Sequence, residues 1–167
     1  RWDTTSMSAR VGALEEARER YERHEWAGAL EVFREVERDA ALTGQDLEQI
    51  AWSTRWSAEP SDWFDAFECA ESAFVEEGDR RGAARMALEL ARHNVQAMNP
   101  TAGQAAMVRA LAHLEDEPES PEHGFAHWCM AYPFTEVGDL STAEAELHEA
   151  LDIAERLEDR GIEALAK

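Results

Sequence analysis

Residues 138–159 read GDLSTAEAELHEALDIAERLED, and this stretch decides how the chain is expected to fold. Its apolar and small residues recur at steps of three, four and three, as Leu140, Ala143, Leu147 and Ala150. This spacing places the four side chains on one face of an α-helix. One occurrence would describe any amphipathic helix, whereas recurrence at a fixed interval would indicate an array of repeated helices.

The same steps recur three more times along the chain. The four starting positions are Trp26, Trp63, Pro100 and Leu140, which lie 37, 37 and 40 residues apart. The last interval is longer because it contains the extended turn EDEPESPEHG at residues 115–124. The further copies are Trp26, Ala29, Phe33 and Val36; Trp63, Ala66, Ala70 and Ala73; and Pro100, Gly103, Met107 and Ala110.

Two other sets of residues keep register with these copies. Nine positions before each start lies a small residue, and the set is Ala17, Thr54, Ala91 and Ala131. Small residues at matched positions let two helices approach closely. The residues directly before the starts are Glu25, Asp62, Asn99 and Asp139, of which the last three are strong helix N-caps. The pattern therefore predicts pairs of helices.

Strand patterns are almost absent, and Ala, Glu, Leu and Arg, which favour helices, dominate the composition. We therefore expect an all-α fold, arranged as an α-solenoid of about four antiparallel helix pairs plus a short terminal helix. The expected pairs cover residues 8–41, 44–78, 79–116 and 120–158. We expect residues 1–7 to be a tag remnant or disordered tail. Residues 159–167 are expected to start a further helix of a longer array or to cap the last pair.

Charge and cysteine content narrow the functional classes. The formal net charge of −20 over 167 residues argues against direct nucleic-acid binding, which needs a basic surface. Cys69 and Cys129 are too few for a disulfide framework, and no apolar run is long enough to span a membrane. We expect a cytoplasmic location.

Three segments carry a resemblance to a known family: HEWAGALEVF (24–33), SDWFDAFECA (61–70) and GDLSTAEAEL (138–147). They resemble the second helix of the tetratricopeptide repeat (TPR), a helix pair of 34 or slightly more residues. Together with EEGDRRGAARMALELA and EPESPEHGF, they make the chain similar to the helical-repeat region of actinobacterial LuxR-type and cyclase-linked transcriptional regulators. The resemblance covers about residues 8–167 and implies a right-handed superhelix with a sensory or protein-interaction role. The chain departs from the full family pattern because it carries no Walker-type phosphate loop, cyclase domain or helix-turn-helix.

In such repeats the first helix of each pair lines the concave face, and this implies a candidate binding surface. The residues placed there are Arg18, Arg55, Arg85, Arg92, Phe125, Trp128 and Tyr132. The arginines are expected to bind carboxylates of an acidic protein or peptide, and the aromatic residues to add apolar anchors. The alternative is that each arginine pairs with a nearby glutamate such as Glu22, Glu59 or Glu89.

Other candidate residues are given structural roles. The expected repeat positions are Ala17, Trp26, Ala29, Trp63, Ala66, Ala91, Ala131 and Ala143, with the two tryptophans wedging the helix pairs together. Trp52 and Trp56 are expected to pack in the core, and Cys69 to be a small packed residue. No metal or cofactor is expected, because His127 and Cys129 are two apart on a helix and face different directions, and His123 lies in a turn.

We expect a non-catalytic interaction or sensory domain of a bacterial regulatory protein that binds a peptide or protein segment in its concave groove. A small-molecule effector sensor is the alternative. An enzyme centred on His127 or Cys129 is disfavoured, because no paired carboxylates, nucleophile–base pair or phosphate loop stands out. A homodimer formed through an apolar end face of the array is a further alternative.

Overall fold

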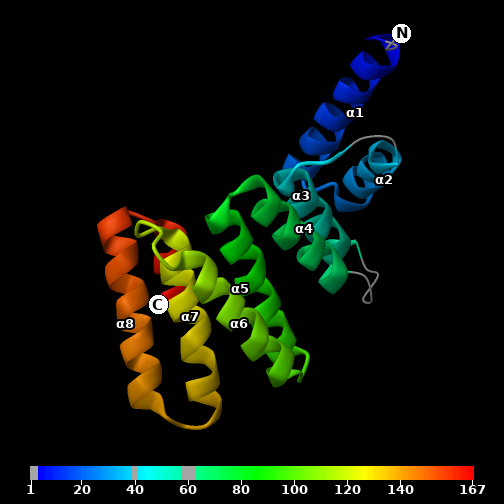
Figure 1. Ribbon diagram of the computed structural model, residues 1–167. Helices are drawn as coiled ribbons and strands as arrows, with labels where there is room; N and C mark the ends of the chain where they lie inside the picture. Colours follow the sequence, from blue (N-terminus) through cyan, green and yellow to red (C-terminus); the bar gives the residue numbers. More distant parts are fainter. Residues whose placement is uncertain (1–3, 39–40, 58–62) are drawn as a thin grey trace. The chain divides into compact units, whose positions relative to one another are not determined.

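The computed structural model describes residues 4–38, 41–57 and 63–167, and its regular structure is entirely helical (Figure 1). These residues contain no strand, so the prediction of an all-α fold is confirmed. None of the described helices is long and apolar enough to cross a lipid bilayer. The helices are α1 (Thr4–Glu22), α2 (Trp26–Glu37), α3 (Gly44–Trp56), α4 (Trp63–Glu77), α5 (Arg80–Gln96), α6 (Pro100–Leu114), α7 (Pro121–Glu136), α8 (Leu140–Leu157) and α9 (Arg160–Ala166).

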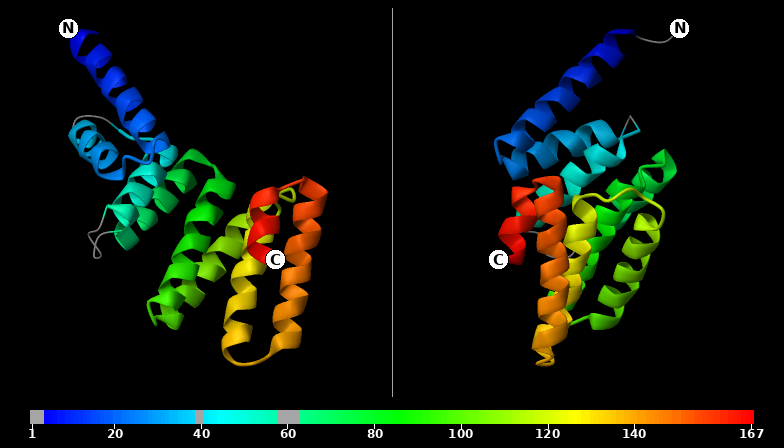
Figure 2. Two further views of the ribbon diagram at one scale, coloured as in Figure 1. Left: turned by 180° about the vertical axis from the view of Figure 1, so that it is seen from behind. Right: turned by 90° about the vertical axis from the view of Figure 1, so that its left-hand side faces the viewer.

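The chain divides into two compact units, Arg1–Gly78 and Asp79–Lys167, and each is described by itself. In the first unit, α1 packs on α2 and α3 on α4, and α3 also contacts both α1 and α2. In the second unit, α5 packs on α6 and α7 on α8, and α7 also contacts both α5 and α6. The short helix α9 packs on α7 and α8 (Figure 2).

The observed boundaries differ from the expected ones at the start of the chain. Helix α1 begins at Thr4, so residues 4–7, which were expected to belong to a tail, are helical. Residues 1–3 lie outside the described residues, as does the expected N-cap Asp62.

Two of the expected N-caps form as side-chain hydrogen bonds. The side chains of Asn99 and Asp139 accept the backbone N–H groups of Ala102 (3.3 Å) and Thr142 (3.2 Å), respectively. Glu25 makes no capping bond. Its carboxylate instead accepts a hydrogen bond from a nearby arginine, Arg23, on the same turn. The longer glutamate therefore lies beside the helix start without satisfying it, in contrast to the shorter Asn and Asp side chains.

The small residues of the first helices are all buried, and they mark where paired helices meet. This set is Ala17, Thr54, Ala91 and Ala131. Helices α5 and α6 approach closely, because a Cβ atom added at Gly103 would lie 3.0 Å from the carbonyl oxygen of Ala91. The same atom would lie 2.8 Å from Cγ2 of Val95. Only a residue without a side chain fits at Gly103 without a shift of its neighbours.

The second helices bury their pattern positions less uniformly. Ala29 and Ala143 are buried, but Ala66 is only half-buried. In α4 the pattern position Ala70 is buried as expected, but the other buried apolar side chains are Phe67 and Phe74, and Ala73 is half-buried. The reason is size, since the two phenylalanine rings fill more of the core than the alanines of the pattern do.

The tryptophans at the starts of two second helices are both half-buried. Trp26 meets Tyr21 of α1 edge to face, with ring centroids 5.2 Å apart. Trp63 lies edge-on to Phe67 within α4, with centroids 6.0 Å apart. Trp26 therefore lies at the contact between the helices of its pair, whereas this contact of Trp63 is within its own helix.

The packing of α5 against α6 predicts an unusual response to substitution. In an open helix, Gly→Ala raises stability by roughly 1 kcal/mol through helix propensity. Gly103→Ala should instead lower it by about 1–2 kcal/mol, because the new methyl group overlaps Val95 and the Ala91 carbonyl. Ala105, exposed on the same helix, is the matched control. Ala105→Gly should lower the unfolding free energy by roughly 1 kcal/mol, the difference in helix propensity between the two residues. Urea unfolding measures both changes, and a stabilised Gly103→Ala protein would show that the two helices are not in close contact there.

Candidate partner-binding surface

Arg18, the first arginine of the expected binding column, is held within its own unit. Its Nε and Nη2 atoms donate to the two carboxylate oxygens of Asp46 at 2.8 and 3.1 Å. Asp46 is 1% exposed and also accepts hydrogen bonds from the backbone N–H and hydroxyl of Thr43, forming the capping box of α3. Arg18 therefore balances a buried carboxylate that begins the next helix pair.

Two arginines of the second unit are also paired with carboxylates. Arg92 donates from Nη2 and Nε to one oxygen of the buried Glu89, at 2.6 and 3.1 Å. Arg85 of α5 donates to Glu122 of α7 at 3.0 Å. The Arg92–Glu89 pair agrees with the alternative prediction that the arginines pair with nearby glutamates. The partners of Arg18 and Arg85 instead belong to the following pair of helices. Glu59 lies outside the described residues.

Arg55 has a different environment from these three arginines. Its guanidinium carbon lies 5.1 Å from the ring centroid of Trp56 and 5.1 Å from that of Trp63, a geometry suited to cation–π attraction. Its Nε atom is buried without a hydrogen-bond partner, and no carboxylate of the described residues pairs with it. Two indole rings therefore neighbour a cation whose Nε–H makes no hydrogen bond.

Further aromatic rings extend this site along α3 and α4. Trp52 is half-buried, stacks on Trp56 with centroids 6.4 Å apart, and meets Phe67 edge to face at 5.1 Å. Trp56 is 55% exposed, so the expectation that it packs in the core is wrong. It is the last residue of α3. We call the set of Trp52, Arg55, Trp56 and Trp63 the Arg55 cluster.

The aromatic residues expected on the binding face of the second unit are mostly in its core. Phe125 and Trp128 stack with centroids 5.7 Å apart and pack against buried residues of α5, α6, α8 and α9. Tyr132 is 41% exposed. The stacked rings therefore tie α7 to its neighbours, and Tyr132 is the one of the three that presents a large surface to solvent.

The two cysteines have opposite environments. Cys129 is buried, and this burial, followed by the negative charge of Glu89, raises the pKa of its thiol far above the usual range. Cys69 is exposed, so the expectation that it is a packed core residue is wrong. Within the described residues, no group of three or more His, Cys, Asp or Glu side chains could hold a metal ion.

The sequence analysis missed two grooves, one in each unit. The groove of the second unit has a volume of about 460 Å³ and is lined by Leu111, Ala112, Leu114, Glu115, His123, Ala126, His127 and Met130. The groove of the first unit has a volume of about 410 Å³ and is lined by Ala27, Leu30, Glu31, Arg34, Glu35, Arg38, Thr54 and Ser57. The expectation that His123 lies in a turn is wrong, because α7 begins at Pro121 and includes it. His123 and His127 are therefore four apart on one face of α7, and this spacing was the only sequence signal for the groove of the second unit.

Comparison with known proteins gives this surface no assigned role. The chain matches no model of a known protein family, no curated protein and no solved structure.

The pair between Arg18 and Asp46 makes a prediction about stability. Arg18→Met keeps the aliphatic stem but leaves a buried carboxylate without its cation, which should cost about 1–3 kcal/mol of unfolding free energy. Arg23→Met is the control, because Arg23 pairs with glutamates at the exposed surface and its loss should change stability little. Equal effects of the two substitutions in urea unfolding would contradict the structural role of Arg18.

The cysteine environments predict unequal thiol reactivity. Because the thiolate is the reacting form, Cys129 should be labelled by a soluble disulfide reagent at least about tenfold more slowly than Cys69 in the folded protein. In denaturant the two rates should converge. The rates are followed optically on the single variants Cys69→Ser and Cys129→Ser, and rapid labelling of Cys129 in the folded state would contradict its burial.

Proposed function

We propose that the chain is a non-catalytic interaction module of a bacterial regulatory protein, built as a TPR-like α-solenoid that binds a protein or peptide segment. Support for the repeat arrangement comes from helix contacts that recur inside each unit. The first helix of a pair contacts both helices of the preceding pair, as α3 does with α1 and α2, and α7 with α5 and α6. Helix α9 repeats this relation with α7 and α8. The buried small residues of all four first helices add to this support.

The Arg55 cluster is the observation that carries the binding proposal. Tryptophan and arginine are the residues most enriched where binding energy concentrates at protein interfaces. Trp56 offers a largely exposed indole, and Arg55 lies beside it without a carboxylate partner among the described residues. In a chain with a net charge of −20, a cation that no carboxylate of the described residues pairs with is the feature that suits a carboxylate from outside.

The chemistry of the cluster defines the partner as a segment with an Asp or Glu beside an apolar or aromatic residue. The carboxylate would accept hydrogen bonds from Arg55, and the apolar neighbour would cover Trp56. Arg18, Arg85 and Arg92 would contribute less, because a partner would first have to displace the carboxylates that they already hold. The proposed binding site is therefore the Arg55 cluster alone, in place of the whole set of arginines expected on the concave face.

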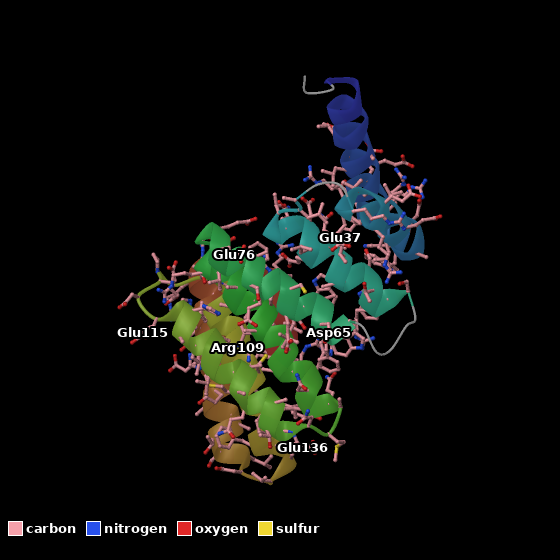
Figure 3. The ribbon with its side chains drawn as sticks, turned by 45° about the vertical axis from the view of Figure 1, so that its right-hand side comes forward. Glu37, Asp65, Glu76, Arg109, Glu115 and Glu136 are labelled. Atoms are coloured by element: carbon pink, nitrogen blue, oxygen red, sulfur yellow. The ribbon has the colours of Figure 1, made fainter. Side chains whose placement is uncertain are left out.

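The rest of the acidic surface restricts which acidic segments can bind. Glutamate and aspartate side chains project from helices of both units, among them Glu37, Asp65, Glu76 and Glu136 (Figure 3). Repulsion from these charges would disfavour a densely acidic peptide and favour one with a single carboxylate in an apolar context. Added salt should weaken the attraction between the peptide carboxylate and Arg55. It should not weaken the apolar contact with Trp56.

The proposal is tested with an immobilised peptide library in which each peptide carries one Asp or Glu beside Leu or Trp, and has a twin with Asn or Gln. Wild-type protein should bind a subset of the acidic peptides and lose about tenfold or more of its affinity for their amide twins. Arg55→Gln and Trp56→Ala should each cause a loss of similar size. Arg92→Gln, whose arginine is already paired, should change affinity much less.

Two results would contradict this site assignment. One is equal binding of the acidic peptides and their amide twins. The other is an equal loss of affinity for Arg55→Gln and Arg92→Gln, with circular dichroism confirming that both variants keep their helix content.

A further inference from the structure

The groove of the second unit combines an apolar floor with two imidazoles. It lies between α6 and α7, and its apolar lining comes from Leu111, Leu114, Ala126 and Met130 among others. His123 and His127 line the same groove, one helical turn apart on α7. A volume of about 460 Å³ lies in the range of small-molecule sites, which are mainly apolar with a few placed polar groups.

Hydrogen bonds outside the groove fix which ring nitrogen of each histidine carries a proton. Nδ1 of His123 accepts the backbone N–H of Ser120 at 3.2 Å, so the neutral ring holds its proton on Nε2. Nδ1 of His127 lies 2.7 Å from a carboxylate oxygen of Glu146, which can only accept, so the neutral ring leaves Nε2 bare. In the neutral imidazoles, Nε2 of His123 is therefore a hydrogen-bond donor and Nε2 of His127 is an acceptor.

This opposition argues against a metal and in favour of an organic polar group. A metal ion would need the bare nitrogen of both rings, but the nitrogen of His123 that remains available carries the proton. An amide or hydroxyl group satisfies both rings, because each contains a donor and an acceptor. Residues four apart on a helix have β-carbons about 5–6 Å apart, so one such group can bridge the two imidazoles.

Charge selects further among organic ligands. Glu115 lines the groove, and Glu146 lies behind His127 (Figure 3 labels Glu115, at the end of α6). An anionic ligand would meet both carboxylates, whereas an ammonium group would offer only donors to His123, which also donates. A neutral head group with a donor and an acceptor can hydrogen-bond to both histidines and is not repelled by either glutamate.

From these features we propose that the groove between α6 and α7 is a binding site for a small neutral molecule with an apolar body and an amide or hydroxyl group. The apolar body lies on Leu111, Leu114 and Met130. The polar group accepts from Nε2 of His123 and donates to Nε2 of His127. The site is separate from the Arg55 cluster, and ligand binding to it does not depend on whether that cluster binds a peptide.

The test uses four probes that share a hexyl-length tail and differ in head group: hexanamide, hexan-1-ol, hexanoate and hexylammonium. They are titrated near pH 7.5 into the isotope-labelled full chain, and methyl signals of Met130 and Leu111 and imidazole nitrogen signals report binding. Hexanamide should bind best, with a Kd in roughly the millimolar range expected for so few atoms. Hexanoate and hexylammonium should bind at least about fivefold more weakly.

Variants assign the binding to the histidines and to the groove. His127→Phe should weaken hexanamide at least about fivefold and hexanoate much less, because the amide can donate to the accepting nitrogen of His127 and the carboxylate cannot. Leu111→Asp, at a position 41% exposed, should abolish binding of all four probes with little effect on the fold. His148→Phe is the control, since His148 lies outside the groove and bonds within α8, and it should leave binding unchanged.

Three results would overturn the proposal. Hexylammonium or hexanoate binding as tightly as hexanamide would show that charge, not the imidazole pair, governs the groove. Unchanged Met130 and Leu111 signals at saturating hexanamide would show that the groove does not bind this class. Long-range proton–nitrogen spectra of the wild-type protein that place the neutral proton of His123 on Nδ1, or that of His127 on Nε2, would remove the basis for the selectivity even if every variant failed to fold.

Discussion

Close approach of helices through small residues is the constraint on which the packing of the second unit depends. Gly103 leaves no room for a Cβ atom against Val95 and the Ala91 carbonyl, and Gly124 leaves none against Ile162 of α9. Helices at this separation gain dispersion contacts along much of their length, and a single added methyl group would force them apart. A similar close contact is present in the first unit, where a Cβ atom added at Gly44 of α3 would overlap the ring of Phe74.

Ion pairs connect separate elements of a chain in which 36 acidic residues outnumber 16 lysines and arginines. Arg18 reaches from α1 to the start of α3, and Arg85 reaches from α5 to the start of α7. Arg156 of α8 pairs with Glu119 in the turn before α7, and this contact lowers the pKa of that exposed glutamate. Two of these arginines, Arg18 and Arg85, thus connect one helix pair to the start of the next pair in the same unit. Arg55 differs in that its guanidinium lies beside two indole rings, those of Trp56 and Trp63.

The sequence predicted the parts of the fold that depend on local periodicity. Helix content, the burial of Ala17 and Ala91, and the cap at Asn99 follow from spacing and residue type, which act within one or two turns. The candidate site was less predictable, because the partner of Arg18 is 28 residues away in sequence and is reached only when helices pack. The exposure of Trp56 likewise depends on where α3 ends relative to its neighbours, which no local pattern contains.

The measurement that tests the packing most directly is a nuclear Overhauser spectrum of the isotope-labelled chain in solution. We expect strong cross-peaks between the α-protons of Gly103 and a methyl group of Val95, and between those of Gly124 and a methyl group of Ile162. These pairs are distant in sequence or lie on different helices, so only close helix contact produces them. Absence of both cross-peaks in a protein that retains its helical signals would contradict the central claim that glycine and alanine contacts hold the helices together.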